Sequence, residues 1–316
     1  MGFSEIPPIE KYDFYLDIAF GTARNAINAK RSSIRGDKIR KARKLEYDRL
    51  FIINKTIKSR LVDIAKTFPN FDDLSEFYEQ LVRTMLDFDK IKASLGALNW
   101  ASNKISTFTR EYQKRLSSVD TPANMKSVAS QYSGRVSSVM RQIAKNLRYL
   151  EETRKTVKDF PSIKEDYFTV AIAGFPNVGK STVLSKLTDS KPDIQPYAFT
   201  TKTLNVGYMK HGVRKVQFID TPGTLNRIDK MNKIEKIAYL AMKYCADQLV
   251  YVYDLTESYS LEEQEKLHKK VLAFRKPTLV YLSKTDILPK EVVDSFKKPA
   301  IKDIEKLKQE IISCSS

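Results

Sequence analysis

Eight residues near the middle of the chain have the pattern of a loop that binds nucleotide phosphates. The segment Gly174-Phe-Pro-Asn-Val-Gly-Lys-Ser181 fits G-x-x-x-x-G-K-[ST]. An apolar run, Phe168–Ala173, precedes it and predicts a buried strand, and Lys180–Leu187 follows it and predicts a helix. In this context the glycines let backbone N–H groups close around phosphate oxygens, and the helix N-terminus adds partial positive charge. The segment therefore predicts a nucleoside triphosphate site.

Side chains in and after this loop have the chemistry to hold a triphosphate and Mg²⁺. Lys180 is expected to reach the β- and γ-phosphates, and the Ser181 hydroxyl is expected to ligate Mg²⁺. Asp220 ends a later predicted strand in the run Asp220-Thr-Pro-Gly223. Its carboxylate can hold Mg²⁺ through water, and the Gly223 amide can touch the γ-phosphate. The other loop positions that we predict to contact the nucleotide are Asn177, Val178, Gly179 and Thr182.

Two threonines between the loop and Asp220 are candidates for a γ-phosphate sensor. The run Pro196-Tyr-Ala-Phe-Thr-Thr201 precedes a predicted strand. A threonine in such a loop can close on Mg²⁺ when a γ-phosphate is present, which orders the loop. The sequence does not choose between Thr200 and Thr201. Both are therefore candidate metal ligands and, together with Lys180 and Gly223, candidate catalytic residues.

A third cluster predicts which base is bound. Ser283-Lys-Thr-Asp286 follows a predicted strand, where the Asp286 carboxylate can accept hydrogen bonds from N1–H and the exocyclic amine of guanine. Adenine offers no such pair of donors, so Asp286 favours GTP and argues against an ATPase. We place Ser283 in the same site, and the alkyl stem of Lys284 would lie over the base. Loop residues after the last predicted strand are expected to offer a backbone N–H to the guanine carbonyl: Ser313, Cys314 and Ser315.

The second half of the chain has the alternation of an α/β fold. From about residue 168 onward, apolar runs of strand length alternate with helical stretches, which predicts a mixed six-stranded sheet with crossover helices over residues 161–316. His211-Gly212 predicts a hairpin turn and makes the second strand the antiparallel edge. The six predicted strands are 168–173, 204–209, 213–219, 248–253, 278–282 and 311–313.

Residues 1–160 predict an elongated, antiparallel, all-α helical bundle. Apolar residues recur at three- and four-residue steps, for example over residues 50–64, which is the one-face period of amphipathic helices. Thr121 before Pro122 is typical of a helix start, and Asp72 or Asp73 can cap a short helix that follows. Only five glycines occur among these 160 residues, so we expect long helices in a bundle. We assign the apolar stripes to its core.

Charge points to a polyanionic partner. The chain has 55 Lys and Arg against 38 Asp and Glu, a formal net charge of +17. Residues 1–160 carry 30 cations against 19 acids and the remainder 25 against 19, so the surpluses are +11 and +6. A surplus of this size favours nucleic acid or an anionic membrane surface.

One segment concentrates this charge at a helix–loop–helix junction around Arg35-Gly-Asp37. A solvated surface is the ordinary explanation of such a run, but cations around a glycine turn also suit phosphate contacts. We predict RNA contacts from its eight cations, which are Lys30, Arg31, Arg35, Lys38, Arg40, Lys41, Arg43 and Lys44. The same basic surface can extend over Tyr112, Lys114, Arg115, Arg135, Arg141, Lys145 and Arg148.

Cysteine usage and the N-terminus give weaker indications. Cys245 and Cys314 are far apart and form no disulfide framework or metal-binding pattern. The first residues lack the basic start and apolar core of a signal peptide, and no apolar run approaches the length of a membrane span. We therefore expect a cytoplasmic protein that is a monomer in isolation.

Taken together, these motifs resemble the nucleolar GTP-binding protein 1 family, within the Obg superfamily of GTPases. Pro176-Asn177, Tyr197-Ala-Phe-Thr-Thr201 and Asp220-Thr-Pro-Gly223 point to the superfamily. Phe77-Tyr-Glu-Gln-Leu81 and the segment 34–41 resemble the family, in an archaeal-type form without the long C-terminal extension of eukaryotic members. The resemblance implies GTP hydrolysis with Mg²⁺ and a switch role in assembly of the large ribosomal subunit, with its RNA or precursor particles as partner.

The chain also departs from the family pattern. Ser283 replaces an asparagine, and its shorter side chain cannot make the same contacts with the base and the phosphate loop, so we expect a reduced affinity for guanine. The chain ends at Ser316, so we expect the usual final helix of the domain to be missing. Thr224 stands where many GTPases carry a water-orienting glutamine, so hydrolysis is expected to be slow. Asn177 resembles an asparagine that ligates K⁺ in related GTPases, which makes K⁺ a candidate cofactor.

Two alternatives of other classes stay open at this point. The chain can be an RNA-binding scaffold whose nucleotide site serves only folding or placement. It can also be a GTPase that uses its basic segment on an anionic membrane surface.

Overall fold

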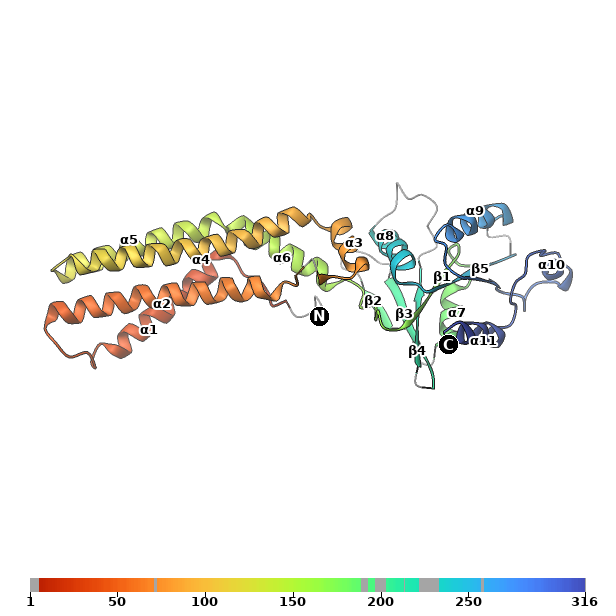
Figure 1. Ribbon diagram of the computed structural model, residues 1–316, viewed down its shortest axis with the longest axis horizontal. Coiled ribbons are helices and arrows are strands. Elements are labelled where there is room, and N and C mark those ends of the chain that lie inside the picture. The colour runs from red at the N-terminus through yellow and green to blue at the C-terminus, as the bar shows by residue number, and fades with distance from the viewer. Residues whose placement is uncertain are drawn as a thin grey trace. The chain divides into compact units, whose positions relative to one another are not determined.

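The chain folds into two compact units (Figure 1). The computed structural model describes residues 6–70, 73–188, 193–196, 203–212, 214–221, 233–256 and 259–315. One unit consists of Met1–Asp73 and Leu86–Lys158, and the other of Leu74–Met85 and Asp159–Ser316. The division differs from the predicted boundary at residue 160 mainly in one segment, because Leu74–Met85 packs with the second unit.

The first unit is a bundle of long helices. It contains α1 (Tyr12–Lys30), α2 (Lys38–Thr67), α4 (Phe88–Ser117), α5 (Pro122–Gln142) and α6 (Ala144–Lys158), and α2 contacts α1, α4 and α5. The predicted apolar stripes form its core, as at Leu50, Ile57 and Ile105, which are at most 1% exposed. The predicted helical period is therefore confirmed, because the apolar stripe of each helix is the side that it buries.

Short polar contacts fix where these helices begin and how they meet. Thr121 caps α5 by accepting from Asn124 N at 3.2 Å, with Pro122 in the first turn as predicted. Asp37 caps α2 by accepting from Arg40 N at 2.7 Å. The buried Tyr132 hydroxyl of α5 lies 2.8 Å from Thr109 Oγ1 of α4. The two caps give hydrogen-bond partners to backbone N–H groups at helix starts, and the third contact gives partners to two buried hydroxyls.

The second unit is built on a mixed six-stranded sheet with the order β2-β3-β4-β1-β5-β6. Its strands are β1 (Phe168–Ala173), β2 (Asp193–Pro196), β3 (Thr203–His211), β4 (Arg214–Asp220), β5 (Gln248–Tyr253) and β6 (Thr278–Leu282). β1 lies parallel to β4 and β5, and β6 is parallel to β5. β3 and β4 are antiparallel, and His211 pairs with Arg214 across the predicted hairpin. The predicted α/β fold is confirmed.

Two predicted details of the sheet are wrong. The antiparallel edge is β2, which pairs with β3, so the strand we expected at the edge is internal. The predicted strand 311–313 belongs to a helix, α11 (Ile304–Cys314), which buries Leu307 and Ile311 one turn apart. A short apolar run does not distinguish a strand from a helix by its period alone. α11 contacts α7 (Lys180–Leu187), so the final helix that we expected to be missing is present.

The other helices of this unit are α8 (Lys233–Leu240), the π-helical turn η4 (Ala241–Cys245), α9 (Leu261–Leu272) and α10 (Lys290–Asp294). α3 (Glu76–Met85) joins them from the first half of the chain and contacts α8 and η4. It buries Phe77, Leu81 and Val82. Among the residues that the structure describes, no helix is both long enough and apolar enough to span a bilayer.

Tyr78 ties α3 to the segment that leads into β1. Its hydroxyl donates to Pro161 O at 2.8 Å and accepts from Ile163 N at 3.2 Å. Burial raises the pKa of Tyr78 to about 12, so the hydroxyl stays protonated as a donor. α3 is thus anchored to the second unit by a polar contact as well as by its apolar face.

Candidate nucleotide-binding site

The predicted phosphate loop joins β1 to α7 at the carboxyl ends of the parallel strands. Its backbone turns through left-handed conformations at Gly174 (φ 151°), Asn177 (φ 62°) and Gly179 (φ 96°). A Cβ at Gly174 would lie 2.7 Å from Val252 O in the neighbouring strand, so a larger residue cannot stand there without moving β5. The edge where parallel strands end is the usual ligand-binding edge of an open α/β sheet.

Lys180 begins α7 and is only 7% exposed. Its Nζ donates to Phe175 O across the loop at 2.7 Å. Burial lowers the pKa of Lys180, and the nearby Asp220 carboxylate offsets part of that effect. An ammonium group has three N–H donors, so this contact leaves donors that can turn toward phosphate oxygens.

Ser181 and Asp220 meet beside the loop. Ser181 Oγ donates to Asp220 Oδ2 at 2.6 Å, and Asn205 Nδ2 donates to the same oxygen at 3.2 Å. The other oxygen, Asp220 Oδ1, is buried and accepts no hydrogen bond from the part of the chain that the structure describes. A buried carboxylate oxygen without a partner is costly, and a hydroxyl with a carboxylate oxygen is the hard donor set that Mg²⁺ prefers. These two residues therefore fit the predicted Mg²⁺.

Ser283 contacts the phosphate loop directly. Its Oγ donates to Val178 O at 2.7 Å and lies 2.9 Å from Tyr253 O at the end of β5, and its side chain is buried. A Cβ at Gly179 would lie 3.6 Å from Ser283 Cβ, so the two loops lie side by side. The short serine therefore reaches the phosphate loop, because the two loops approach closely enough for a hydroxyl to span the gap. The expected reduction in guanine affinity stays a prediction.

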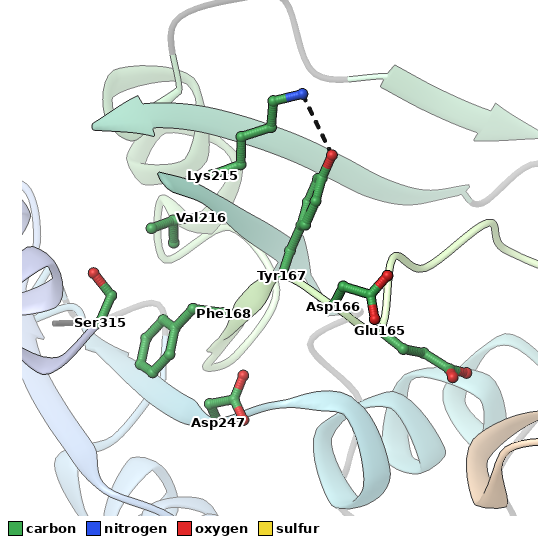
Figure 2. Close-up of a pocket in the computed structure, with 8 residues that line it drawn as sticks. All are labelled: Glu165, Asp166, Tyr167, Phe168, Lys215, Val216, Asp247 and Ser315. Carbon is green, nitrogen blue, oxygen red and sulfur yellow. Dashed lines mark hydrogen bonds between the residues drawn. The ribbon is translucent and has the colours of Figure 1, made fainter. Parts of the chain in front are cut away.

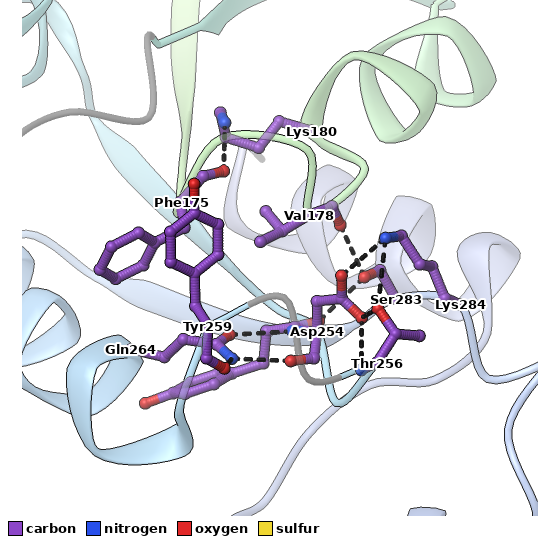
Figure 3. Close-up of polar contacts among 10 residues, drawn as sticks. Phe175, Val178, Lys180, Asp254, Thr256, Tyr259, Gln264, Ser283 and Lys284 are labelled. Carbon is purple, nitrogen blue, oxygen red and sulfur yellow. Dashed lines mark hydrogen bonds and ion pairs between the residues drawn. The ribbon is translucent and has the colours of Figure 1, made fainter.

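Lys284 is held by a buried aspartate. Its Nζ lies 2.7 Å from Asp254 Oδ2, and the Asp254 side chain is 2% exposed (Figure 3). Thr256 donates to the other carboxylate oxygen from its N at 2.9 Å and from its Oγ1 at 2.7 Å. Burial alone would raise the pKa of Asp254, but the hydrogen bonds from Lys284 and Thr256 outweigh it and lower the pKa. Lys284 is thereby fixed at the end of β6, in a left-handed conformation (φ 54°).

Gln264 and Tyr259 complete this network from the start of α9. Gln264 Oε1 accepts from Asp254 N at 3.0 Å, while its Nε2 donates to Asp254 O at 2.7 Å and to Tyr259 O at 3.0 Å. The Tyr259 ring packs against Phe175 of the phosphate loop with centroids 4.4 Å apart (Figure 3). The loop is therefore supported from both sides, by Ser283 and by the residues around Asp254.

Sequence reasoning missed this support, although a signal was present. Asp254 directly follows an entirely buried strand, β5, just as Asp220 ends β4. An acid at the carboxyl end of a buried parallel strand lies at the ligand-binding edge, so both aspartates satisfied the same criterion. Only Asp220 belongs to a recognised motif, so the sequence predicts a role in the site for Asp220 and not for Asp254.

The predicted guanine loop at the end of the chain is wrong. Ser313 and Cys314 lie in the last turn of α11, and Ser315 follows it. Ser315 lines a cavity of about 710 Å³ with Tyr167, Phe168 and Val216, at the amino ends of β1 and β4 (Figure 2). That edge is opposite to the phosphate loop, so these three residues do not belong to the nucleotide site.

Another segment occupies the place beyond β6. Ile301 N donates to Val280 O at 2.9 Å, and Leu282 N donates to Ile301 O at 2.9 Å, which forms a parallel bridge beside β6. Asp303 then caps α11 by accepting from Lys306 N. The turn at Lys302 and Asp303 thus lies at the carboxyl edge of the sheet, on the same side as the exposed Asp286. A single bridging residue has no period, so the sequence pattern could not reveal it.

The remaining predicted residues divide into two groups. Asn177 is exposed in the loop, Val178 is buried, and Thr182 is exposed in the first turn of α7. Thr200, Thr201, Gly223 and Thr224 lie outside the described residues, as does Asp72. Their proposed roles stay predictions.

The Ser283 contact generates a direct test. Ser283→Ala removes the hydrogen bond to Val178 O, and we expect the Kd for GDP to rise about fivefold, the value of one typical net hydrogen bond. Isothermal titration of the purified chain measures this. Ser313→Ala is the matched control, because the one bond of its Oγ to a described residue stays within α11, to Glu310 O. An unchanged Kd for Ser283→Ala, or an equal rise for Ser313→Ala, would contradict the placement described above.

Comparisons with known proteins agree with this geometry. Residues 3–164 match the NOG1 N-terminal helical domain, and residues 169–284 match a family described as 50S ribosome-binding GTPase. An uncharacterized protein of Methanocaldococcus jannaschii is 35% identical over 80% of this chain and 72% of its own length. Nucleolar GTP-binding protein 1 of Drosophila melanogaster is 35% identical over 81% of this chain, and that of Saccharomyces cerevisiae is 31% identical over 97%.

The chain spans 40% and 48% of the length of those two nucleolar GTP-binding proteins. Within that span, one family match covers the helical bundle. The other runs from β1 through the phosphate loop to Lys284. The sequence motifs, the sheet and these matches agree. The chain belongs to the nucleolar GTP-binding protein 1 family and carries a P-loop GTPase domain.

Proposed function

We propose that the chain hydrolyses GTP slowly and acts as a switch in assembly of the large ribosomal subunit. The observation that carries the enzymatic part is the convergence of Lys180, Ser181 and Asp220 at one edge of the sheet, with Asp220 Oδ1 buried and unpartnered within the described part of the chain. The ribosomal part is supported by the family description 50S ribosome-binding GTPase and by relatives named as nucleolar GTP-binding proteins.

In this proposal, the protein acts by positioning and by charge. The Lys180 ammonium leaves Phe175 O for the β- and γ-phosphate oxygens, while backbone N–H groups of the loop hold the phosphates. Ser181 and Asp220 would hold Mg²⁺, which when bound neutralises charge on the β- and γ-phosphates. Gly223 and either Thr200 or Thr201 would sense the γ-phosphate. Thr224 cannot orient water as a glutamine does, which supports slow intrinsic turnover.

We propose that ribosomal RNA or a precursor particle binds the basic junction between α1 and α2. Three of its eight cations already have structural partners. Lys30 and Lys44 both pair with Asp48, and Arg43 donates to Val119 O and Asp120 at the α4–α5 turn. The other five form no ion pair within the described residues and are available for phosphates: Arg31, Arg35, Lys38, Arg40 and Lys41.

A route from nucleotide to RNA is supported by the position of α3. This helix lies in the chain between α2 and α4, yet it packs on α8 and η4, the first described elements after residues 222–232. If the γ-phosphate changes the segment that contains Gly223, α8 is the next described element of the chain, and α3 packs on α8. α3 is covalently joined to the bundle at both ends, so a shift of α3 is also felt there.

Base selectivity tests the enzymatic proposal. Asp286→Asn replaces one carboxylate oxygen, which accepts hydrogen bonds, by an NH₂ group, which donates them. This donor cannot bond the exocyclic amine of guanine, which is also a donor, but it can bond the carbonyl that xanthine has at the same position. We expect the Kd for GTP to rise at least tenfold and XTP to support turnover instead. Phosphate release with both nucleotides measures this. Asp294→Asn is the control, because Asp294 is an exposed acid of α10. GTP binding that is unaffected by Asp286→Asn would contradict the assigned base site.

The monovalent cation has its own test. Asn177 is exposed within the phosphate loop, so its amide oxygen is available to a K⁺ beside the phosphates. We expect faster GTP turnover in KCl than in NaCl, and we expect this difference to disappear in Asn177→Gly. Glycine removes the side chain but accepts the left-handed backbone (φ 62°) of this position. Equal turnover of the wild type in the two salts would exclude a role for K⁺.

Charge neutralisation at the junction tests the RNA proposal. Neutralising Arg31, Arg35 and Lys38 to Gln should weaken binding to a large-subunit ribosomal RNA fragment and reduce the slope of log K against log salt by about two to three. Filter binding across a salt series measures this. The control removes equal charge from the other unit through Lys290→Gln, Lys297→Gln and Lys306→Gln.

Several outcomes would contradict parts of this proposal. Equal losses in both triple variants would show a general charge effect. Binding to anionic vesicles but not to RNA at matched salt would favour the membrane-surface alternative. Equal RNA affinity in the GDP and GTP-analogue states would remove the switch and favour the scaffold alternative.

A further inference from the structure

A groove between α4 and α5 has features that the proposed function has not used. It encloses a cavity of about 310 Å³ in the helical unit, which is at the small end of ligand pockets and suits a single nucleoside. The α4 wall presents Trp100, Lys104, Phe108 and Glu111, at steps of three or four residues along one face. The α5 wall presents Arg135 and Gln142.

The aromatic residues of this groove are partly exposed. Trp100 is 44% exposed, although large apolar side chains of the bundle are otherwise mostly buried. Phe108 is intermediate in exposure and has cations on its ring, with Lys104 Nζ 5.2 Å and the Arg135 guanidinium carbon 6.0 Å from its centroid. Aromatic faces beside exposed cations are the elements with which proteins stack an unpaired base and hold its phosphate.

The surroundings favour an anionic ligand. Lys104 and Arg135 form no ion pair with any residue that the structure describes, and Glu111 is the only acid on the groove wall. Between Asp120 and Glu151 the sequence holds five cations and no acid. Glu111 and Gln142 add a carboxylate and an amide, groups that can bond the polar edge of a base.

We propose that the groove between α4 and α5 binds one nucleotide of single-stranded RNA, with its base stacked on Trp100 and its phosphate beside Lys104 and Arg135, which lie at the Phe108 ring. The inference rests on the proposed RNA-binding function, but it assigns a second contact, made by α4 and α5 rather than by the α1–α2 junction. Base-paired RNA is not a ligand for this groove, because its bases are already stacked and paired.

The chain provides its own probe for this site, because Trp100 is its single tryptophan. We titrate the GDP-loaded full chain with a short oligouridylate and record tryptophan fluorescence, while anisotropy of labelled RNA measures binding. We expect the oligouridylate to quench Trp100 as it binds. A duplex of equal length and a ribose-phosphate strand without bases should bind without quenching. Trp100→Ala should weaken oligouridylate binding roughly five- to 150-fold, the factor for stacking one base.

Phe51→Ala is the matched control, because Phe51 is an exposed aromatic of α2 (55%) outside the groove. It should change neither quenching nor affinity, and circular dichroism checks that both variants fold. RNA that binds without quenching, or a duplex that quenches equally, would overturn the groove and leave the junction proposal standing. Absence of any RNA binding by anisotropy would overturn both proposals.

Discussion

The site depends on one constraint, which is that the phosphate loop must keep its backbone N–H groups turned inward. A loop that points several N–H donors at one place cannot use them to stabilise itself, so its shape must be held from outside. Here β5 approaches so closely that only glycine fits at Gly174, and Ser283 holds the carbonyl of Val178 from the opposite side. Phe175 is covered by the Tyr259 ring. The loop is therefore shaped by strand ends and by α9 rather than by its own sequence alone.

The same support explains why a buried ion pair lies so near the site. Asp254 receives four hydrogen bonds in all, to its carboxylate and its backbone oxygen, from Lys284, Thr256 and Gln264. A buried carboxylate that is fully paired costs little, whereas removal of one partner leaves a charge without compensation. Movement of Lys284 away from Asp254 would therefore cost free energy. The pair therefore holds the backbone next to Ser283, whose hydroxyl contacts the phosphate loop at Val178 O.

Local chemistry was predictable from the sequence, and long-range proximity was not. The phosphate loop, Asp220 and the helical stripes all follow from spacing within one element, and the structure has them as expected where it describes them. The contact between Ser283 and Val178 O could not be predicted from the length of the serine side chain, because the distance between two loops is a property of the sheet. The predicted strand 311–313 is wrong because a run as short as Ile311-Ile-Ser313 fits both periods. Burial of Leu307 and Ile311 on one face decided in favour of a helix.

The packing of α3 could not be predicted from the sequence either, because the helix lies in the chain between two helices of the bundle. α3 ends at Met85, and the cap of α4, Asp87, follows after a single residue. Asp87 accepts from Lys90 N within α4 and, through its carbonyl, from the Tyr149 hydroxyl of α6. The start of α4 is therefore held inside the bundle, while α3 is held by Tyr78 and its apolar face beside α8. Adjacency in the chain therefore does not decide to which unit a short amphipathic helix belongs. The partner of its apolar face decides this, and for α3 that partner is formed by α8 and η4.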